Sequence, residues 1–243
     1  MFEARGKIEI FKRIVETISM IVSEAKFNVE SGGLQIRAVD PAHVAMVDLR
    51  VDPEAYDEFK ADNVELGVDL DKLGDIIKLG RGSEAVHLVY DEHSQRMVMT
   101  IGNLVRRMTL LDTATMSDPK IPNLQFPAKI EISTEELMRG IRAAESVSDY
   151  VILLVEQDKF ELSAGTQEQM VQTFDEDKLF SIECKDRVRS LFSLDYLSSM
   201  VKAIKEDRIS LSIGNDYPVR IDFSVLNGHG KVSYLLAPRT EAE

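Results

Sequence analysis

Apolar and polar residues follow a helical period near the start of the chain. Between residues 7 and 22, apolar side chains recur every three or four positions, and charged side chains fill many of the positions between them. This spacing puts the apolar residues on one side of a helix and predicts an amphipathic helix there. The apolar side carries Phe11, Ile14, Val15, Ile18 and Ile21, and the other side carries Lys12, Arg13, Glu16 and Ser19.

Two shorter stretches show the same period. One begins near Asp71, buries Leu73, Ile76 and Ile77, and ends at the Gly-Arg-Gly sequence of residues 80–82. The other covers residues 195–204 and repeats the pattern with Leu, Met, Val and Ile. Each predicts a helix of two to three turns.

A further helix is predicted after residue 133. Ser133 and Glu136 have the spacing of a capping box, which predicts that the helix begins there and continues to about Ala144. Arg139 and Arg142 are three residues apart, so they share its outer face.

The stretches between these helices predict strands. They are rich in Val, Ile, Leu and Phe and are separated by turn sequences such as Ser-Gly-Gly and Asp-Pro. Strands are predicted over residues 27–29, 34–39, 44–51, 85–90, 97–101, 105–111, 151–155, 159–164, 170–174, 179–184, 188–194, 209–213, 219–225 and 231–237.

Near the middle of the chain, residues 118–127 contain Pro119, Pro122 and Pro127. This proline spacing excludes a helix or a central strand, so the segment must run as an extended connector. It divides the chain into a domain of residues 1–117, a connecting loop of residues 118–127 and a domain of residues 128–243.

The two predicted domains resemble each other in sequence. Residues 70–78 (LDKLGDIIK) match residues 194–202 (LDYLSSMVK) in the placement of Leu, Asp, Leu and Lys. Residues 34–38 also match residues 160–164, at a nearly equal separation along the chain. Several matches in one order favour a twofold repeat. Each half then has two helices among many antiparallel strands, which is an α+β fold.

Size and composition fit two modest soluble domains. The chain has 243 residues, of which 44% are hydrophobic and 29% charged. Its single cysteine, Cys184, cannot form a disulfide within the chain and suits a reducing compartment. The sequence has no signal peptide and no apolar run of about 20 residues, so we expect a soluble intracellular protein without a membrane association.

The net charge of −13 argues against nucleic acid as a partner, because phosphates repel an acidic surface. The distribution of cations leads to a different expectation. If the repeat places the four helices on one side, their cations form one basic surface that holds DNA through phosphates without reading bases. Solvent-facing helix positions attract Lys and Arg in any protein, which is the simpler interpretation for one helix alone. The candidate DNA-facing residues are Lys7, Lys12, Arg13, Lys72, Lys78, Arg81, Arg139, Arg142, Lys202 and Lys205.

Motifs for catalysis and for metal or cofactor binding are absent from the sequence. The four histidines, His43, His87, His93 and His229, lack metal-ligand spacing, and one cysteine cannot form a Cys-rich zinc site. The Gly-Arg-Gly and Gly-His-Gly sequences do not continue into a nucleotide-binding motif. We therefore expect no enzymatic activity, no catalytic residue, no cofactor and no bound metal.

Five segments carry a family resemblance, namely residues 1–5 (MFEAR), 40–49 (DPAHVAMVDL), 67–70 (GVDL), 148–151 (SDYV) and 234–239 (YLLAPR). They resemble the proliferating cell nuclear antigen family, the sliding clamps of archaea and eukaryotes. The short acidic end, residues 240–243, resembles archaeal members more than eukaryotic ones. The resemblance covers essentially the whole chain, with its motifs in order.

The resemblance implies the DNA-clamp fold: a homotrimeric ring around duplex DNA, with helices lining the hole and sheets outside. Its function would be that of a processivity factor in DNA replication and repair. A basic bore inside an acidic exterior would reconcile the net charge with DNA binding.

The resemblance also implies a groove for short hydrophobic motifs of DNA polymerase, clamp loader, flap nuclease and ligase. The connecting loop contributes to it. Ordinary packing and turns would explain the same residues without a partner. The groove would contain His43, Val44, Ala45, Met46, Lys120, Ile121, Pro122, Pro218, Leu235, Ala237 and Pro238.

Ring closure would use edge strands, over residues 105–109 in one domain and 170–174 in the other. The expected subunit interface contains Arg106, Arg107, Glu145, Asp149 and Met170, with either arginine facing an acid across the joint. The alternative is a checkpoint-type or hetero-oligomeric ring subunit that acts as a protein-interaction scaffold. We expect a cytoplasmic protein if the source is archaeal and a nuclear one if it is eukaryotic.

Overall fold

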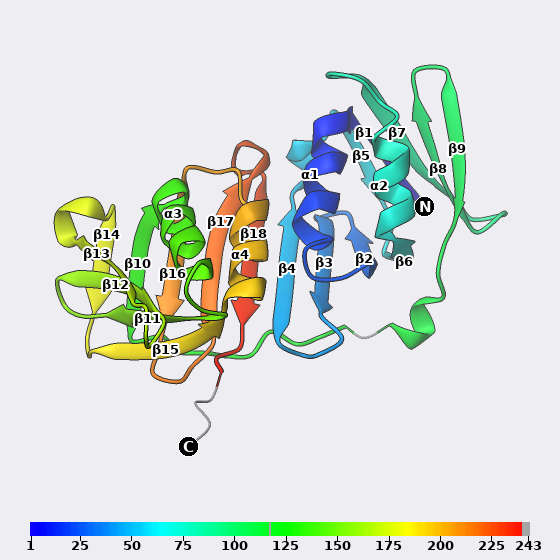
Figure 1. The fold of residues 1–243 in the computed structure, drawn as a ribbon. Coiled ribbons are helices and arrows are strands. Elements are labelled where there is room, and N and C mark those ends of the chain that lie inside the picture. The colour runs from blue at the N-terminus through cyan, green and yellow to red at the C-terminus, as the bar shows by residue number, and fades with distance from the viewer. Residues whose placement is uncertain (117, 240–243) are drawn as a thin grey trace. The chain divides into compact units, whose positions relative to one another are not determined.

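Two compact units make up the chain in the computed structural model, which describes residues 1–116 and 118–239 (Figure 1). The first unit contains Met1–Pro41, Val47–Ile121 and Ser224–Val232, and the second contains Ala42–Met46, Pro122–Phe223 and Ser233–Glu243. Ser117, at the end of the predicted first domain, and the acidic end over residues 240–243 lie outside the described residues.

Strands and α-helices follow the same order in the two halves of the chain, as a twofold repeat requires. The first half runs β1 (Phe2–Lys7), α1 (Ile8–Ile18), β2 (Glu24–Glu30), β3 (Gly33–Val39), β4 (Ala45–Val51), η1 (Pro53–Ala55), β5 (Glu58–Ala61), β6 (Val64–Asp69), α2 (Leu70–Ile77), β7 (Ala85–Asp91), β8 (Arg96–Ile101), β9 (Leu104–Thr109) and η2 (Thr113–Thr115).

The second half repeats this series with a short 3₁₀ turn before its last strand. It runs β10 (Ala128–Ser133), α3 (Thr134–Glu145), β11 (Tyr150–Val155), β12 (Lys159–Ala164), β13 (Met170–Asp175), η3 (Glu176–Lys178), β14 (Ser181–Cys184), β15 (Val188–Ser193), α4 (Leu194–Ala203), β16 (Arg208–Ile213), β17 (Val219–Val225), η4 (Leu226–Gly228) and β18 (Gly230–Leu236). The predicted α+β class and the duplication are confirmed.

Sheet order is also repeated. In the first half β5-β1-β7-β8-β9 are neighbours, and in the second half β14-β10-β16-β17-β18 are neighbours in the matching order. The remaining strands form the series β4-β3-β2-β6 and β13-β12-β11-β15. The registers that define these pairs are antiparallel, for example Phe27 opposite Ile36 and Leu153 opposite Leu162. Strands β9 and β13 are each at an edge of their sheet: among the described strands, β9 pairs only with β8 and β13 only with β12.

Helices α1 and α2 pack side by side within the first unit (Figure 1). Ile14 and Ile18 of α1 and Leu73 and Ile76 of α2 are buried, as the apolar spacing predicted. The expectation that Arg13 lies on the outer side is wrong, because only 8% of this residue is exposed. Arg13 and Thr17 are one turn apart and both buried, so a second flank of α1 is covered.

In the second unit, α3 packs against α4 and against strands β10 to β13. Leu137, Ile141 and Ala144 are fully buried on α3, and Arg139 and Arg142 are exposed. A Cβ on Gly140 would overlap the end of the Gln172 side chain from β13, so this side chain lies against the helix at Gly140.

The predicted capping box at Ser133 does not form. Ser133 is the N-cap residue of α3, but its side chain makes no cap hydrogen bond. Ser133 is the last residue of β10. The next residue, Thr134, bonds to the segment just before β16: its amide donates to the Asp207 carbonyl at 3.0 Å, and its hydroxyl donates to the Glu206 carbonyl at 2.6 Å. Glu136 instead lies 3.4 Å from Arg139.

Four strands were missing from the sequence-based prediction, namely β1, β5, β6 and β10. Strands β1 and β10 are equivalent in the repeat, and each leads into a helix without an intervening loop. No helix among the described residues is long and apolar enough to cross a membrane.

Asp69 provides a test of how α2 begins. Its Oδ1 atom accepts the Lys72 amide at 2.9 Å, and its Oδ2 atom lies 2.7 Å from the Lys72 ammonium. The Lys72 side chain and then this backbone bond lower the pKa of Asp69. We expect Asp69→Ala to lower the free energy of unfolding by about 1 kcal/mol in denaturant titrations near neutral pH.

The pH dependence follows from the lowered folded-state pKa. The carboxylate's contribution is complete above the ordinary aspartate pKa and is lost as the pH falls through the lowered value. The difference between wild type and Asp69→Ala must therefore shrink in acid. Ser193, the equivalent cap residue of α4, makes no side-chain cap bond, so Ser193→Ala is a matched control that we expect to be nearly neutral. Equal losses in the two variants would contradict this account.

Candidate functional site

A hollow of about 490 Å³ lies between α1 and α2 in the first unit. Its lining includes Ile8, Val15 and Ile77 together with the cations Lys12 and Lys78. Glu9 and Glu16 line it too, so the hollow carries both signs of charge. Of the two lysines near α2, only Lys78 lines the hollow, and Lys72 does not.

The helix lysines of the first unit each have a carboxylate neighbour. Lys12 lies 3.8 Å from Glu16, and Lys78 lies 2.9 Å from Asp75. Lys72 contacts Asp69, as described above. Hydrogen bonds to these aspartates raise the pKa of the Lys72 and Lys78 ammonium groups, so both stay charged.

The other candidate cations of the first unit do not line this hollow. Lys7 is exposed at the end of β1, and Arg81 is exposed in the turn after α2, where its amide donates to a Glu84 carboxylate oxygen at 2.6 Å. Arg13 is buried and presents no charge to a ligand on the helix surface.

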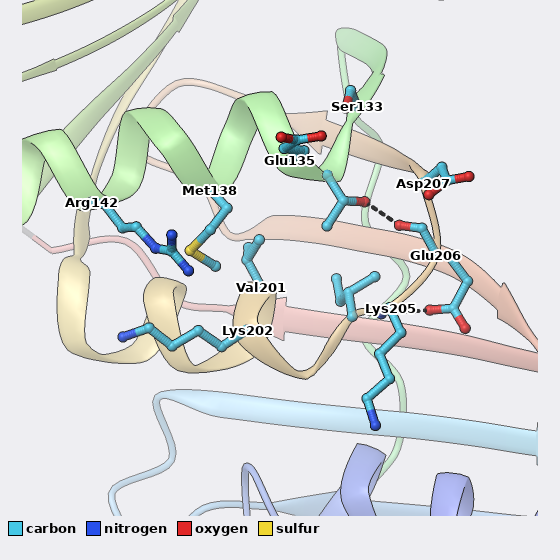
Figure 2. Close-up of a pocket in the computed structure, with 11 residues that line it drawn as sticks. Ser133, Glu135, Met138, Arg142, Val201, Lys202, Lys205, Glu206 and Asp207 are labelled. Carbon is cyan, nitrogen blue, oxygen red and sulfur yellow. Dashed lines mark hydrogen bonds between the residues drawn. The ribbon is translucent and has the colours of Figure 1, made fainter. Parts of the chain in front are cut away.

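In the second unit, α3 and α4 border a hollow of about 420 Å³ (Figure 2). Arg142 from α3 and Lys202 from α4 lie at one end of it, and Lys205 extends from the turn after α4. Three carboxylate residues lie toward the other end: Glu135, Glu206 and Asp207. The structure thus brings together three of the four predicted cations of this unit.

Arg142 differs from Lys202 and Arg139 because only those two have a carboxylate neighbour among the described residues. Lys202 lies 3.5 Å from Glu145 and Arg139 lies 3.4 Å from Glu136, whereas Arg142 makes no ion pair with any residue that the structure describes. Arg139 does not line the hollow. A planar guanidinium with free donors matches the oxygens of a phosphate group, so Arg142 is the best-placed anion contact on these helices.

The chemistry of both hollows suits phosphate contact without base recognition. Their linings contain no aromatic side chain on which a base could stack. Within the described residues, no group of three or more His, Cys, Asp or Glu could hold a metal ion. Burial raises the pKa of the Cys184 thiol, which keeps it protonated near neutral pH.

Two of the predicted groove residues of the second unit, Val44 and Ala237, meet where the segment 42–46 lies beside the described end of the chain. The Ala237 amide donates to the Val44 carbonyl at 2.8 Å. His43 is exposed and has a positive φ of 56°, which turns the backbone there. Val44, Pro218, Ala237 and Pro238 are half-buried, whereas Ala45, Met46 and Leu235 are buried.

The connecting loop is anchored by an aromatic residue that sequence reasoning did not assign to the site. Phe126 meets Tyr217 edge to face, with ring centres 5.6 Å apart, and the Arg220 guanidinium lies 5.1 Å from the Phe126 ring centre. An aromatic side chain at the end of a proline-rich connector was the signal available for it. Lys120, Ile121 and Pro122 lie in this loop, and Ile121 shows 40% of its surface.

The residues expected at a subunit interface lie on or near two edge strands. Arg106 and Arg107 are exposed on β9, where Leu104 and Val105 are exposed as well. On β13, Met170 is half-buried and Val171 is 58% exposed. Glu145 and Asp149 are exposed near the end of α3, and Glu145 already has Lys202 as a neighbour.

Comparison with known proteins gives matches over almost the whole chain. The family model described as proliferating cell nuclear antigen, N-terminal domain, matches residues 1–117, and the corresponding C-terminal domain model matches residues 120–239. A DNA polymerase sliding clamp of Methanococcoides burtonii is 42% identical, with 100% of both chains covered.

Solved structures match equally well. The structure titled as the C-terminal region of FEN-1 bound to A. fulgidus PCNA has a TM-score of 0.92 and 32% identity, with 100% of both chains covered. PCNA from Thermococcus kodakaraensis has a TM-score of 0.91 and 23% identity, covering 98% of this chain and 100% of that one, and shows the same fold. The archaeal likeness predicted from the sequence is confirmed by these relatives.

The Phe126 anchor can be tested by Phe126→Ala. We expect faster protease cleavage and faster amide exchange in residues 118–125, because the alanine variant cannot pack against Tyr217 and Arg220. Global stability should fall by about 1 kcal/mol, as for removal of one aromatic pair. Phe180→Ala is a matched control: it removes an exposed ring that lies 4.6 Å from the Arg208 guanidinium and should leave the connector unchanged. Unchanged cleavage in Phe126→Ala would refute the anchor.

Proposed function

Because the chain belongs to the proliferating cell nuclear antigen family, whose relatives here are DNA polymerase sliding clamps, we propose that three copies close into a ring around duplex DNA. The ring would tether replication and repair enzymes to the duplex as a processivity factor. The observation that carries this proposal is the pair of edge strands β9 and β13, which have no second neighbour among the described strands.

The repeat indicates how these edges close. In the duplicated order, β9 corresponds to β18 and β13 corresponds to β4. The residues that directly flank β4 are hydrogen-bonded to those that directly flank β18. The Asp52 amide donates to the His229 carbonyl at 2.8 Å, and the Ala237 amide donates to the Val44 carbonyl at 2.8 Å. Strands β9 and β13 of two different copies can repeat the pairing that their counterparts make within one chain. Such a joint is head-to-tail, and head-to-tail joints form a ring when their rotation closes, as we propose for three copies.

Backbone pairing and apolar contacts should dominate this joint. Exposed Leu104, Val105 and Val171 would be covered by it. Arg106 or Arg107 can face Glu145, Asp149 or both, next to Met170. Exposed ion pairs contribute only about 0–1 kcal/mol each, and Glu145 already has Lys202 as a partner. The charges should therefore help to orient the two subunits and add little to the stability of the joint.

DNA contact is assigned to the four helices. The cations Lys12 and Lys78 in the first unit and Arg142, Lys202 and Lys205 in the second line the two hollows. We expect the second unit to contribute more, since Arg142 has no carboxylate partner among the described residues. Lys7, Lys72, Arg81 and Arg139 are exposed and supplement this set, and Arg13 supports α1 from inside.

Partner enzymes are assigned to the segments around the chain end. The A. fulgidus relative holds the C-terminal region of FEN-1, and we propose that this chain takes the flap nuclease, DNA polymerase, clamp loader and ligase through short hydrophobic motifs. The groove would use His43, Val44, Pro218, Ala237 and Pro238, with Lys120, Ile121 and Pro122 from the connecting loop.

The division into domains 1–117 and 128–243 around a connecting loop at 118–127 is part of the same proposal. So are a cytoplasmic location and the absence of any catalytic activity in the chain itself. A clamp acts by topology, so loose and sequence-independent phosphate contacts are sufficient.

Ring formation predicts the mass of the purified protein. Light scattering should give three times the chain mass of 27.4 kDa, and Val105→Asp together with Val171→Asp should give single chains, because charges would then occupy the joint. The assembly should weaken only slightly in molar salt, since ion pairs contribute little. A stable monomer for the wild type would contradict the homotrimer and favour the hetero-oligomeric scaffold instead.

Charge reversal tests the DNA surface. We expect the combined Arg139→Glu, Arg142→Glu, Lys202→Glu and Lys205→Glu variant to keep its trimer mass, to load poorly on circular duplex DNA and to stimulate a polymerase weakly. The log–log slope of its affinity against salt should fall by about one unit for each phosphate that the variant no longer binds. The matched control reverses four exposed cations that lie outside the four α-helices, Lys129, Lys178, Lys185 and Lys231. Equal loading by both variants would exclude the helices as the DNA surface.

A further inference from the structure

The described end of the chain is fixed at two backbone positions within the second unit. After β18, the Ala237 amide donates to the Val44 carbonyl at 2.8 Å, and the Arg239 amide donates to the Leu191 carbonyl of β15 at 2.7 Å. Pro238 lies between them and has no amide hydrogen. Residues 237–239, which we call the tail, therefore have no backbone donor left and present only carbonyl acceptors.

A side-chain contact fixes the same segment from the outside. The Arg239 Nη2 atom donates to the Tyr150 hydroxyl at 3.0 Å, and the guanidinium carbon lies 5.0 Å from the centre of the Tyr150 ring. Tyr150 is itself held at the start of β11, where its amide donates to the Ser148 hydroxyl at 3.0 Å and its backbone pairs with Ser193. Arg239 is thus bound to a residue with a defined position in the sheet.

The position of the tail along β15 is also restricted. The Arg189 carbonyl, two residues before Leu191, accepts the Asp216 amide at 3.1 Å. Because alternate carbonyls of a strand point to the same edge, the tail cannot move to that earlier position without displacing the loop before β17. The Arg239 contact with Tyr150 selects Leu191 as its attachment point.

We propose that Arg239 and Tyr150 are positioning residues for partner peptides, acting as a clamp that holds the tail in one register. This inference rests on the proposed partner groove. An extended peptide in that groove would donate its backbone amides to the tail carbonyls, while its apolar side chains enter the groove. A fixed tail spares the peptide the cost of ordering it, so the clamp raises affinity mainly by slowing dissociation.

Because the tail offers only backbone carbonyl acceptors, it also restricts which peptides can bind. A peptide must offer an unblocked amide hydrogen opposite residues 237–239, so proline or an N-methylated residue at that position would be rejected. The same rule does not apply to peptide positions that face away from the tail.

The test uses the assembled full-length protein and a synthetic peptide with the sequence of the C-terminal region of an archaeal FEN-1. Binding and dissociation are measured by surface plasmon resonance for wild type, Arg239→Ala and Tyr150→Phe. We expect Arg239→Ala to weaken binding by about three- to tenfold through a faster off-rate, the effect expected for removing one or two hydrogen bonds. Tyr150→Phe keeps the ring and should have a smaller effect.

Two further readouts separate positioning from general stability. In Arg239→Ala, amide exchange should increase at residues 237 and 239, with an unchanged thermal midpoint. Arg208→Ala is the matched control, since it removes a guanidinium stacked at 4.6 Å on the exposed Phe180 ring, and peptide binding should not change. An N-methyl scan of the peptide should find at least one position at which methylation abolishes binding.

The outcomes distinguish the clamp from the groove. Wild-type protein that fails to bind the peptide would overturn the proposed groove. If the peptide binds wild type and dissociates from Arg239→Ala at the same rate as from wild type, the clamp is overturned and the groove remains. Weaker binding accompanied by an equal loss in thermal stability would also overturn the clamp, because Arg239 would then act on the fold.

Discussion

The backbone edges of its sheets are the constraint that organises this molecule. A strand at an edge exposes amide and carbonyl groups that need partners, and an exposed edge with apolar side chains invites another strand. On β15, the Arg189 and Leu191 carbonyls are occupied by the Asp216 and Arg239 amides. Strands β9 and β13 remain open among the described strands and carry exposed Val105 and Val171. The duplicated sheet order thus leaves open the two edges whose counterparts are already bonded.

The charges of the helices suit the DNA contact that we propose for them. Lys12, Lys78 and Lys202 each lie within 4.0 Å of a carboxylate, as part of a chain whose net charge is −13. Exposed pairs of this kind contribute only about 0–1 kcal/mol, so a passing phosphate can replace the carboxylate at little cost. Contacts that exchange so easily favour movement along a duplex over residence at one place. A ring can tolerate such weakness because its hold is topological.

Most of the fold could be predicted from apolar spacing, and the exceptions have physical reasons. The helix positions Ile14, Ile141 and Leu197 are buried as their period required. Strand β1 was missed because charged Glu3 and Arg5 interrupt a short run that only one face buries. Arg13 and Leu235 were assigned to surfaces, but tertiary contacts cover them, and no local pattern reveals a second covered flank. The sequence also could not predict the carboxylate partners of the helix lysines, because each pairing depends on side-chain rotamers and packing. Phe126 was available in the sequence but had no periodic pattern to mark it.

Three separate segments near the chain end are held in place before any ligand arrives. Phe126 fixes the end of the connecting loop on Tyr217, the Val44 carbonyl fixes the segment 42–46, and Arg239 fixes the tail. Each attachment is exposed or half-buried and therefore modest in energy, yet together they remove most of the ordering that a bound peptide would otherwise impose. In the proposed groove, this arrangement would let a shallow surface bind short motifs and still release one partner for the next. Affinity in that groove would depend on how well the attachments hold, and residues that touch no ligand would become determinants of binding.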